Sequence, residues 1–356
     1  MSRSRILVWG LSNNRAGTEA VIYNYVRNLP EVNFDFLCYE EPLNYKDLFD
    51  SGSRNRYFVI PVKIQHPIAY MHELSKFMHE HGKEYHTLWF NVNDVSNIDL
   101  LIYAKRYGIQ RRITHMHTSK MAKILITRFF SKLNRKKCLQ LTTDRWACSE
   151  SAGNFLYSSL PYRVIPNMVD AKSCTYNENK RNDVRNEWSL KDSWVIGTVG
   201  RLAKVKNQSF LIRLMPEILE REPKAKLVLV GGGTFEDDLK KIASELNVED
   251  QIVFAGSQLD IQAYLSSFDV FAFPSLYEGF GISLLEAQYN ELPCVISEGV
   301  SEEAIVSTNV QTVALSNAEG WVKSLLQSKR ETNVLISEKA NRYDLKNIAV
   351  ITSEMF

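Results

Sequence analysis

Two carboxylates stand eight residues apart in the segment PSLYEGFGISLLEAQ. Glu278 precedes the turn Gly279-Phe280-Gly281, and Glu286 lies two turns into the helix predicted to follow. A glycine turn ahead of a helix N-terminus directs backbone N–H groups at a ligand and favours anions such as a diphosphate. Carboxylates accept hydrogen bonds from the paired hydroxyls of a ribose or a hexose, so the glutamates are predicted to bind different parts of one ligand. The competing interpretation is a strand–turn–helix corner with two solvated glutamates.

Two histidines end a predicted strand in the sequence THMHTS. A histidine at a strand end can hydrogen-bond a sugar close to a reacting carbon. His117, which Thr118 and Ser119 follow, is the preferred candidate for this role. His115 is the reserve. A purely structural histidine remains the alternative.

These residues lie in a repeated strand–helix pattern. In the first half the predicted strands are 5–9, 34–38, 57–62, 86–91, 112–115, 145–149 and 162–165, with a helix over 68–81. In the second half, WVIGTVG, KLVLVGGG, QIVFAG, DVFAFPS and PCVIS alternate with amphipathic segments at 211–220, 236–246, 261–267 and 281–289. Apolar, β-branched strands between amphipathic helices predict two Rossmann-like α/β domains with parallel sheets. Ligands are then expected in the cleft where the carboxyl ends of the strands face one another.

The length of 356 residues agrees with two domains, predicted at 1–170 and 171–340, with residues 341–356 packing back toward the first domain. The first 170 residues carry 23 Lys and Arg against 15 Asp and Glu, whereas the remainder carries 20 against 26. This asymmetry predicts different partners for the two domains. The 45% hydrophobic content excludes a disordered chain.

The location is predicted from three features of the sequence. No apolar run approaches the roughly 18 residues that span a bilayer. The N-terminus lacks the cleavage site of a secretory signal. The five cysteines are scattered, which favours reduced thiols in a cytoplasm and argues against a zinc site.

A basic segment lies between Leu100 and Thr143, with eleven Lys or Arg and no Asp or Glu. Within it, apolar residues recur at helical spacing among the cations, so residues 119–137 are predicted to lie on an anionic membrane surface. The alternative is an ordinary surface helix whose apolar stripe is buried in the first domain. Nucleic acid ranks last, because no recognition motif accompanies the charge.

The segment PSLYEGFGISLLEAQ resembles the Glu-x7-Glu signature of the family 4 retaining glycosyltransferases, which have the two-domain GT-B fold. Four further segments are similar to that family in the same order along the chain. They are ITHMHTS (113–119), VIPNMVD (164–170), GRLAKVKN (200–207) and VLVGGG (228–233). The resemblance covers nearly the whole chain and is closest to enzymes of bacterial capsule or exopolysaccharide synthesis.

The resemblance implies a role for each matching residue. Arg201 and Lys206 would bind the diphosphate of a nucleotide sugar and stabilise the leaving group, Glu278 would hold the donor sugar and Glu286 the ribose. The N–H groups of Gly279, Phe280 and Gly281 would line the sugar and diphosphate, and Gly17 would approach the donor phosphate. His117 would act near the reaction centre, with His115 and Thr118 on the side of the sugar acceptor. Ala16 stands where many relatives have a second glycine, and a solvated basic loop is the alternative for Arg201 and Lys206.

The expected function is that of a retaining hexosyltransferase that acts on a nucleotide sugar, with UDP the commonest nucleotide in such enzymes. The expected acceptor is a lipid-linked sugar or a growing glycan, and the expected place is the inner face of the plasma membrane. No cofactor is expected, and no metal, since the chain has no Asp-x-Asp to hold a divalent ion. Two alternatives stay open: a nucleotide-sugar epimerase, and a non-catalytic nucleotide-binding partner of another transferase.

Overall fold

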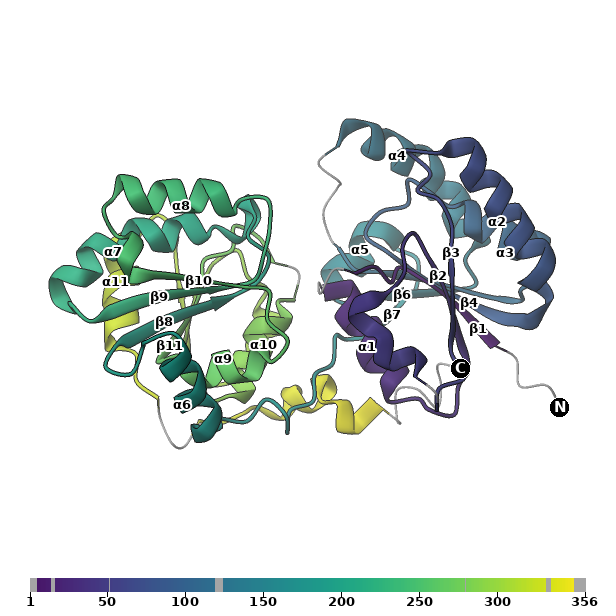
Figure 1. The fold of residues 1–356 in the computed structure, drawn as a ribbon. Coiled ribbons are helices and arrows are strands. Elements are labelled where there is room, and N and C mark those ends of the chain that lie inside the picture. The colour runs from purple at the N-terminus through teal and green to yellow at the C-terminus, as the bar shows by residue number, and fades with distance from the viewer. Residues whose placement is uncertain are drawn as a thin grey trace. The chain divides into compact units, whose positions relative to one another are not determined.

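The computed structural model describes residues 5–13, 17–50, 52–118, 124–278, 280–330 and 334–348. The chain divides into two units, the first reaching Met168 and the second spanning Val169–Lys346 (Figure 1). Asn347 and Ile348 group with the first unit. Most of the segment 341–356, residues 349–356, lies outside the described residues.

The first unit is built on a seven-stranded parallel sheet of order β3-β2-β1-β4-β5-β6-β7. Its strands are β1 (Arg5–Trp9), β2 (Phe34–Cys38), β3 (Arg56–Val59), β4 (Tyr85–Val92), β5 (Arg111–Met116), β6 (Asp144–Ala147) and β7 (Arg163–Val164). Its helices are α1 (Gly17–Arg27), α2 (Pro67–His81), α3 (Asp99–Arg106), α4 (Leu125–Leu141) and α5 (Glu150–Tyr157). Helices α2 to α5 share one apolar core with the sheet, while Tyr25 of α1 packs edge-on against Trp89 from the other face.

The second unit has a six-stranded parallel sheet of order β10-β9-β8-β11-β12-β13. Its strands are β8 (Trp194–Val199), β9 (Ala225–Val230), β10 (Ile252–Gly256), β11 (Val270–Phe273), β12 (Cys294–Ser297) and β13 (Val310–Val313). Its helices are α6 (Glu178–Glu187), α7 (Gln208–Arg221), α8 (Glu236–Glu245), α9 (Ile261–Ser267), α10 (Ile282–Tyr289) and α11 (Ala318–Gln327). Helices α7, α8 and α11 bury one face of the sheet, and α6, α9 and α10 bury the other (Figure 1).

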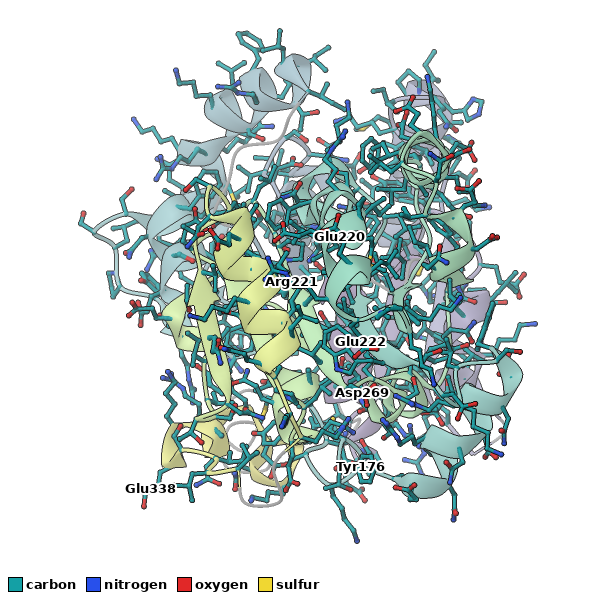
Figure 2. The ribbon with its side chains drawn as sticks, turned by 90° about the vertical axis from the view of Figure 1, so that its left-hand side faces the viewer. Tyr176, Glu220, Arg221, Glu222, Asp269 and Glu338 are labelled. Carbon is teal, nitrogen blue, oxygen red and sulfur yellow. The ribbon has the colours of Figure 1, made fainter. Side chains whose placement is uncertain are left out.

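The connector before the second sheet is anchored by charge as well as by apolar packing. Asp269 accepts hydrogen bonds of 2.6 Å from both Arg181 and Arg185 of α6, and one of 2.7 Å from the backbone N–H of Val195. Figure 2 labels Asp269 in this unit, together with Tyr176, whose ring lies beneath the guanidinium of Arg330. These contacts fix α6 against the amino end of β11, away from the carboxyl ends of the strands.

Candidate active site

The second sheet reverses its strand order between β8 and β11, which are neighbours in space but far apart in the chain. In open parallel sheets, ligands bind at the carboxyl ends of the strands that flank such a reversal. Two loops leave the sheet at this point, residues 200–207 after β8 and residues 274–281 after β11. We call them the switch-point loops.

Backbone hydrogen bonds join the switch-point loops to each other and to the segment that follows β12. The N–H of Leu276 donates to the carbonyl of Val205 at 2.9 Å, and the N–H of Glu278 donates to that of Gly299 at 2.9 Å. Within the first loop, Asn207 adopts a left-handed conformation at the start of α7 and donates its side-chain amide to Pro274. These bonds hold the described parts of the two loops against each other.

The switch-point loops bring together two of the residues predicted to bind a donor. The ammonium of Lys206 forms an ion pair with the carboxylate of Glu278, and both side chains are mostly buried. The same ammonium lies 5.1 Å from the centre of the Phe273 ring, on the last residue of β11. Arg201 is exposed on the first loop, and its guanidinium makes no hydrogen bond or ion pair with the described residues. Of the two cations predicted to bind the donor, Lys206 is thus paired and Arg201 faces solvent.

Glu286 lies on α10, which begins after Gly281 in a left-handed conformation with φ of 71°. Its side chain is partly exposed, and its carboxylate has no hydrogen-bond partner among the described residues. Burial raises the pKa of Glu286 to about 7. Among the described residues, no side chain donates to the Glu286 carboxylate, so it is available to accept hydrogen bonds from the hydroxyl groups of a ligand.

The predicted glycine turn is only partly described. Gly279 lies outside the described residues, while the Phe280 side chain is buried with its ring centre 4.6 Å from that of Tyr343. The predicted ligand contacts of residues 279–281 are backbone contacts, so they stay a prediction here.

A second glycine segment packs under the first loop. A Cβ atom at Gly231 would stand 2.2 Å from the carbonyl oxygen of Gly200, and one at Gly233 would stand 2.2 Å from that of Leu202. The N–H of Leu202 also donates to the carbonyl of Gly232 at 2.9 Å. Glycines here let the turn after β9 support the loop that carries Arg201 and Lys206.

The histidines lie at the carboxyl ends of β4 and β5 in the first unit. His117 is partly exposed, and its Nε2 lies 3.0 Å from Oδ1 of Asn91 on β4. His115 is fully buried beside Trp89, Trp146 and His117, so its burial does not support direct contact with a ligand. Thr118 follows and is partly exposed, and the contribution of both to acceptor binding stays a prediction.

Gly17 is exposed and begins α1, but Ala16 lies outside the described residues, so the predicted phosphate approach is not described. Asn91 was missed by the sequence reasoning. Its only signal was a polar residue near the end of an otherwise apolar strand, LWFNV. Among the described residues, no group of three His, Cys, Asp or Glu side chains is placed to hold a metal ion. The described helices also include none with the length and apolarity that crossing a bilayer requires.

Parts of the chain are similar in sequence to known glycosyltransferases. Residues 180–341 match the family model of the glycosyl transferases group 1. The chain is 28% identical over 325 residues to a Bacillus subtilis protein named as glycosyltransferase EpsF, covering 85% of this chain and 81% of that one. It is 30% identical over 190 residues to an Escherichia coli enzyme named UDP-Gal:alpha-D-GlcNAc-diphosphoundecaprenol alpha-1,3-galactosyltransferase, covering 52% of this chain and 49% of that one.

Two solved structures share the fold at low sequence identity. Anabaena HepE, solved with UDP and glucose, superposes with a TM-score of 0.76 at 18% identity over 99% of both chains. WaaG, a glycosyltransferase involved in lipopolysaccharide biosynthesis, superposes with a TM-score of 0.67 at 14% identity over 98% of this chain and 99% of that one. Both comparisons show the two parallel α/β domains of the GT-B fold. The comparisons thus show the resemblance that the glutamates of the switch-point loop and α10 predicted: residues 180–341 match the family model of the group 1 glycosyltransferases, and most of the chain is similar to EpsF.

Proposed function

We propose that the protein is a retaining glycosyltransferase that moves a hexose or N-acetylhexosamine from a UDP-sugar to a lipid-linked sugar or growing glycan. The proposal is supported by the HepE structures, which were solved in complex with UDP and glucose and with UDP-glucose. It is also supported by two relatives whose names specify diphospho-undecaprenol acceptors, from Escherichia coli and Campylobacter jejuni. The likeness to EpsF favours cell-surface polysaccharide synthesis as its setting.

The observation that carries the proposal is the ion pair between Lys206 and Glu278 at the strand-order reversal. A bound diphosphate would take over Lys206 as its cation and release the Glu278 carboxylate, which could then accept hydrogen bonds from sugar hydroxyls. Arg201, exposed on the same loop, would supply a second fixed charge to the diphosphate. The ion pair would thereby be replaced by two contacts with the donor, one between Lys206 and the diphosphate and one between Glu278 and the sugar.

In the proposed reaction, the bond between the anomeric carbon and the diphosphate oxygen breaks as the acceptor oxygen bonds to the same face of that carbon. The proton of the acceptor hydroxyl passes to the leaving diphosphate. Lys206 and Arg201 stabilise the negative charge that develops on the leaving group, so no metal is required in this proposal. No protein nucleophile is proposed, and the configuration at the anomeric carbon is retained.

The test incubates the purified protein with UDP-, GDP- and ADP-sugars and a short lipid-linked sugar acceptor, in the presence of EDTA. We expect product from a UDP-sugar, with the anomeric configuration of the donor retained by NMR. Arg201→Ala and Lys206→Ala should lower turnover by about 100-fold or more. Lys204→Ala is the matched control, because Lys204 lies on the same loop over the Phe235 ring and outside the ion pair.

Three outcomes would overturn the proposal. Conversion of donor alone into an isomer would identify an epimerase. Nucleotide binding without product, even with a second transferase supplied, would identify a non-catalytic binding subunit. Equal activity of Lys206→Ala and Lys204→Ala would show that the ion pair is not part of the donor site.

We further propose that α4 docks on an anionic membrane surface. Of the predicted segment 119–137, residues 119–123 lie outside the described residues and the rest carries a strongly exposed apolar row. The exposed fractions are 76% for Leu125, 56% for Ile126, 60% for Phe129, 46% for Phe130 and 60% for Leu133. The alternative of an apolar stripe buried in the first unit is therefore wrong for these residues.

The charged side chains of α4 itself are all positive. Arg128, Lys132, Lys136 and Lys137 are exposed on α4, and the helix contains no acidic residue. The buried side chains of α4, Cys138 and Leu141, lie near its C-terminal end. A helix with an outward apolar face and cations at its edges binds the interface of anionic lipids, where each cation adds about 1 kcal/mol. Such docking would bring the enzyme to a lipid-linked acceptor.

Flotation with vesicles of phosphatidylglycerol or phosphatidylcholine tests the docking. We expect the wild type to float with anionic vesicles at low salt and to dissociate at high salt. Leu133→Ser should weaken flotation, whereas Leu259→Ser, which changes a leucine 76% exposed in the second unit, should not. Equal binding to neutral vesicles, or equal effects of the two substitutions, would contradict the proposal.

A further inference from the structure

A buried polar cluster occupies the face of the first sheet that α1 covers, at the carboxyl ends of β4 and β5. It consists of Trp89, Asn91, His115 and His117, and register pairs Asn91 with His115. Trp89 is fully buried and Asn91 is 2% exposed. The rings of the two histidines lie with their centres 4.1 Å apart. This cluster puts four hydrogen-bonding side chains where a parallel sheet presents its ligands.

Hydrogen bonds determine which nitrogen of each imidazole carries the proton. The indole N–H of Trp89 can only donate, and it points to Nδ1 of His115 at 3.3 Å. Nδ1 of His115 is therefore unprotonated, and the neutral ring carries its proton on Nε2. In this tautomer His115 is uncharged, so it packs against His117 without adding a positive charge. We therefore interpret His115 as a packing residue of the cluster.

The proton of His117 is assigned by Asn91. The amide nitrogen of Asn91 donates to the carbonyl of Trp89 at 3.4 Å, which turns Oδ1 toward His117. Since Oδ1 can only accept, Nε2 of His117 donates to it at 3.0 Å, and Nδ1 keeps its lone pair.

The backbone of Asn91 is held by close packing. A Cβ atom at Gly10, whose φ is +110°, would stand 2.7 Å from the Asn91 carbonyl oxygen. The N–H of His117 also donates to the carbonyl of Val92 at 3.0 Å. The strand ends of β1, β4 and β5 therefore leave Asn91 and His117 little freedom to separate.

Nδ1 of His117 is buried and has no hydrogen-bond partner among the described residues. A buried acceptor without a donor is unfavourable, so a ligand hydroxyl that reaches it would satisfy it. Burial lowers the pKa of His117 to about 3, which keeps the ring neutral and the lone pair available in ordinary buffers. The nitrogen is thus suited to accept a hydrogen bond and unsuited to act as a cation.

We propose that Asn91 is a positioning residue that holds His117 as the Nε2–H tautomer, so that Nδ1 accepts a hydrogen bond from a hydroxyl of the bound sugar. The effect on turnover rests on the proposed function, whereas the tautomer does not. Asn91 itself touches no reacting atom in this scheme. It acts by keeping the lone pair of His117 on the ligand side in every molecule.

The tautomer is tested by nitrogen NMR of the protein with 15N-labelled histidine and without substrate. We expect His117 to show a protonated Nε2 and an unprotonated, pyridine-type Nδ1. In Asn91→Ala the two nitrogens should move toward a mixture of tautomers. In Asn55→Ala they should stay unchanged, because this partly buried asparagine bonds Phe34 and Leu48 at the opposite end of the sheet. An unchanged His117 signature in Asn91→Ala would overturn the proposal.

Turnover is tested by a double-mutant cycle. Asn91→Ala should lower kcat by about tenfold, and it should have little further effect in a His117→Ala background, since it acts through that ring. Additive losses would show that Asn91 has a merely structural role and would overturn the proposal. A wild type that transfers no sugar would instead contradict the proposed function, while the NMR result would still decide the tautomer.

The pH profile supplies a readout that loss of packing would not move. Asn91→Asp keeps an acceptor at the same place but adds a carboxylate, which raises the pKa of His117. The titratable side chain that lies against His117 in the described structure is His115, whose own pKa burial lowers. We expect kcat/KM of Asn91→Asp to fall more steeply than that of the wild type as the pH decreases. Identical profiles would count against the proposal.

Discussion

Lys206 and Glu278 satisfy each other's charge in the ligand-free chain, so a donor diphosphate must compete with Glu278 for the lysine. The desolvation of two mostly buried charges makes such a pair a modest contributor to stability, but breaking it by removing one partner leaves the other uncompensated. Removing the Lys206 side chain should therefore weaken nucleotide binding, whereas removing that of Glu278 should not. This distinction separates a donor site from a simple structural ion pair.

Glu278→Ala should bind UDP at least as tightly as the wild type, because Lys206 no longer has a competing carboxylate. Its transfer rate should nevertheless fall by about 100-fold, because the sugar loses an acceptor of its hydroxyl hydrogens. Lys206→Ala should weaken UDP binding by about tenfold or more. Isothermal titration calorimetry with UDP measures the affinities. Equal losses of UDP affinity in both variants would argue for a purely structural pair.

Glu286 should make donor binding depend on pH. Its pKa of about 7 in the free protein leaves the carboxylate mostly protonated at pH 6 and mostly ionised at pH 8. Ribose hydroxyls bind the ionised form more strongly, so binding lowers this pKa and affinity rises with pH, by about tenfold between pH 6 and 8. UDP-glucose is the right probe, since its phosphodiester groups bind no proton in this range. In Glu286→Gln the affinity should be lower and independent of pH.

At the scale of elements, the turn after β9 supports the loop after β8 through direct backbone contact. Gly233→Ala would place a methyl group 2.2 Å from the Leu202 carbonyl oxygen, so the loop must shift. We expect a loss of about 1–3 kcal/mol in the free energy of unfolding, measured with urea, and weaker UDP binding. Gly52→Ala is the control, because nothing lies within 4 Å of its added Cβ. An unchanged UDP affinity in Gly233→Ala would show that this turn does not support the donor site.

Periodicity in the sequence predicted most of the strands that carry the sites. The first strand and the helix at 261–267 were predicted with the bounds of β1 and α9, because strong apolar runs end at polar residues there. The strand predicted at 57–62 was too long, since β3 ends at Val59, two residues before Pro61, which has no N–H for the ladder. Helices α3, α5 and α11 and strand β13 were not predicted. Helices α3, α5 and α11 have only eight to ten residues, and β13 has four, of which two are exposed.

Individual side-chain contacts could not be predicted in the same way. The pairing of Lys206 with Glu278 joins residues 72 positions apart, and it depends on β8 and β11 being neighbours. The bond between Asn91 and His117 depends on the register of β4 against β5. Sequence spacing supplied the residue types, but strand order decides which of them meet. The exposure of the α4 apolar row could not be predicted either. Helical spacing shows that apolar side chains share one face of the helix, but it does not show whether other parts of the protein cover that face.

At the scale of the whole molecule, each unit has its own core. The first unit buries Leu7, Leu88 and Phe90 under α2 to α5, and the second buries its sheet on both faces. Apart from Gly17, the residues predicted to bind the donor lie in the second unit, whereas Asn91 and His117 lie in the first. UDP should therefore stabilise the second unit, and the first should gain only through coupling to it.

Differential scanning calorimetry can separate these contributions. We expect two transitions, of which UDP at 100 times its dissociation constant stabilises one by about 2.7 kcal/mol. Gly233→Ala should lower the temperature of that same transition, and Asn55→Ala should lower the other, which assigns each transition to its unit. If UDP raised the transition that Asn55→Ala lowers, the nucleotide would bind in the first unit, because a ligand stabilises the part of a protein whose unfolding destroys its site.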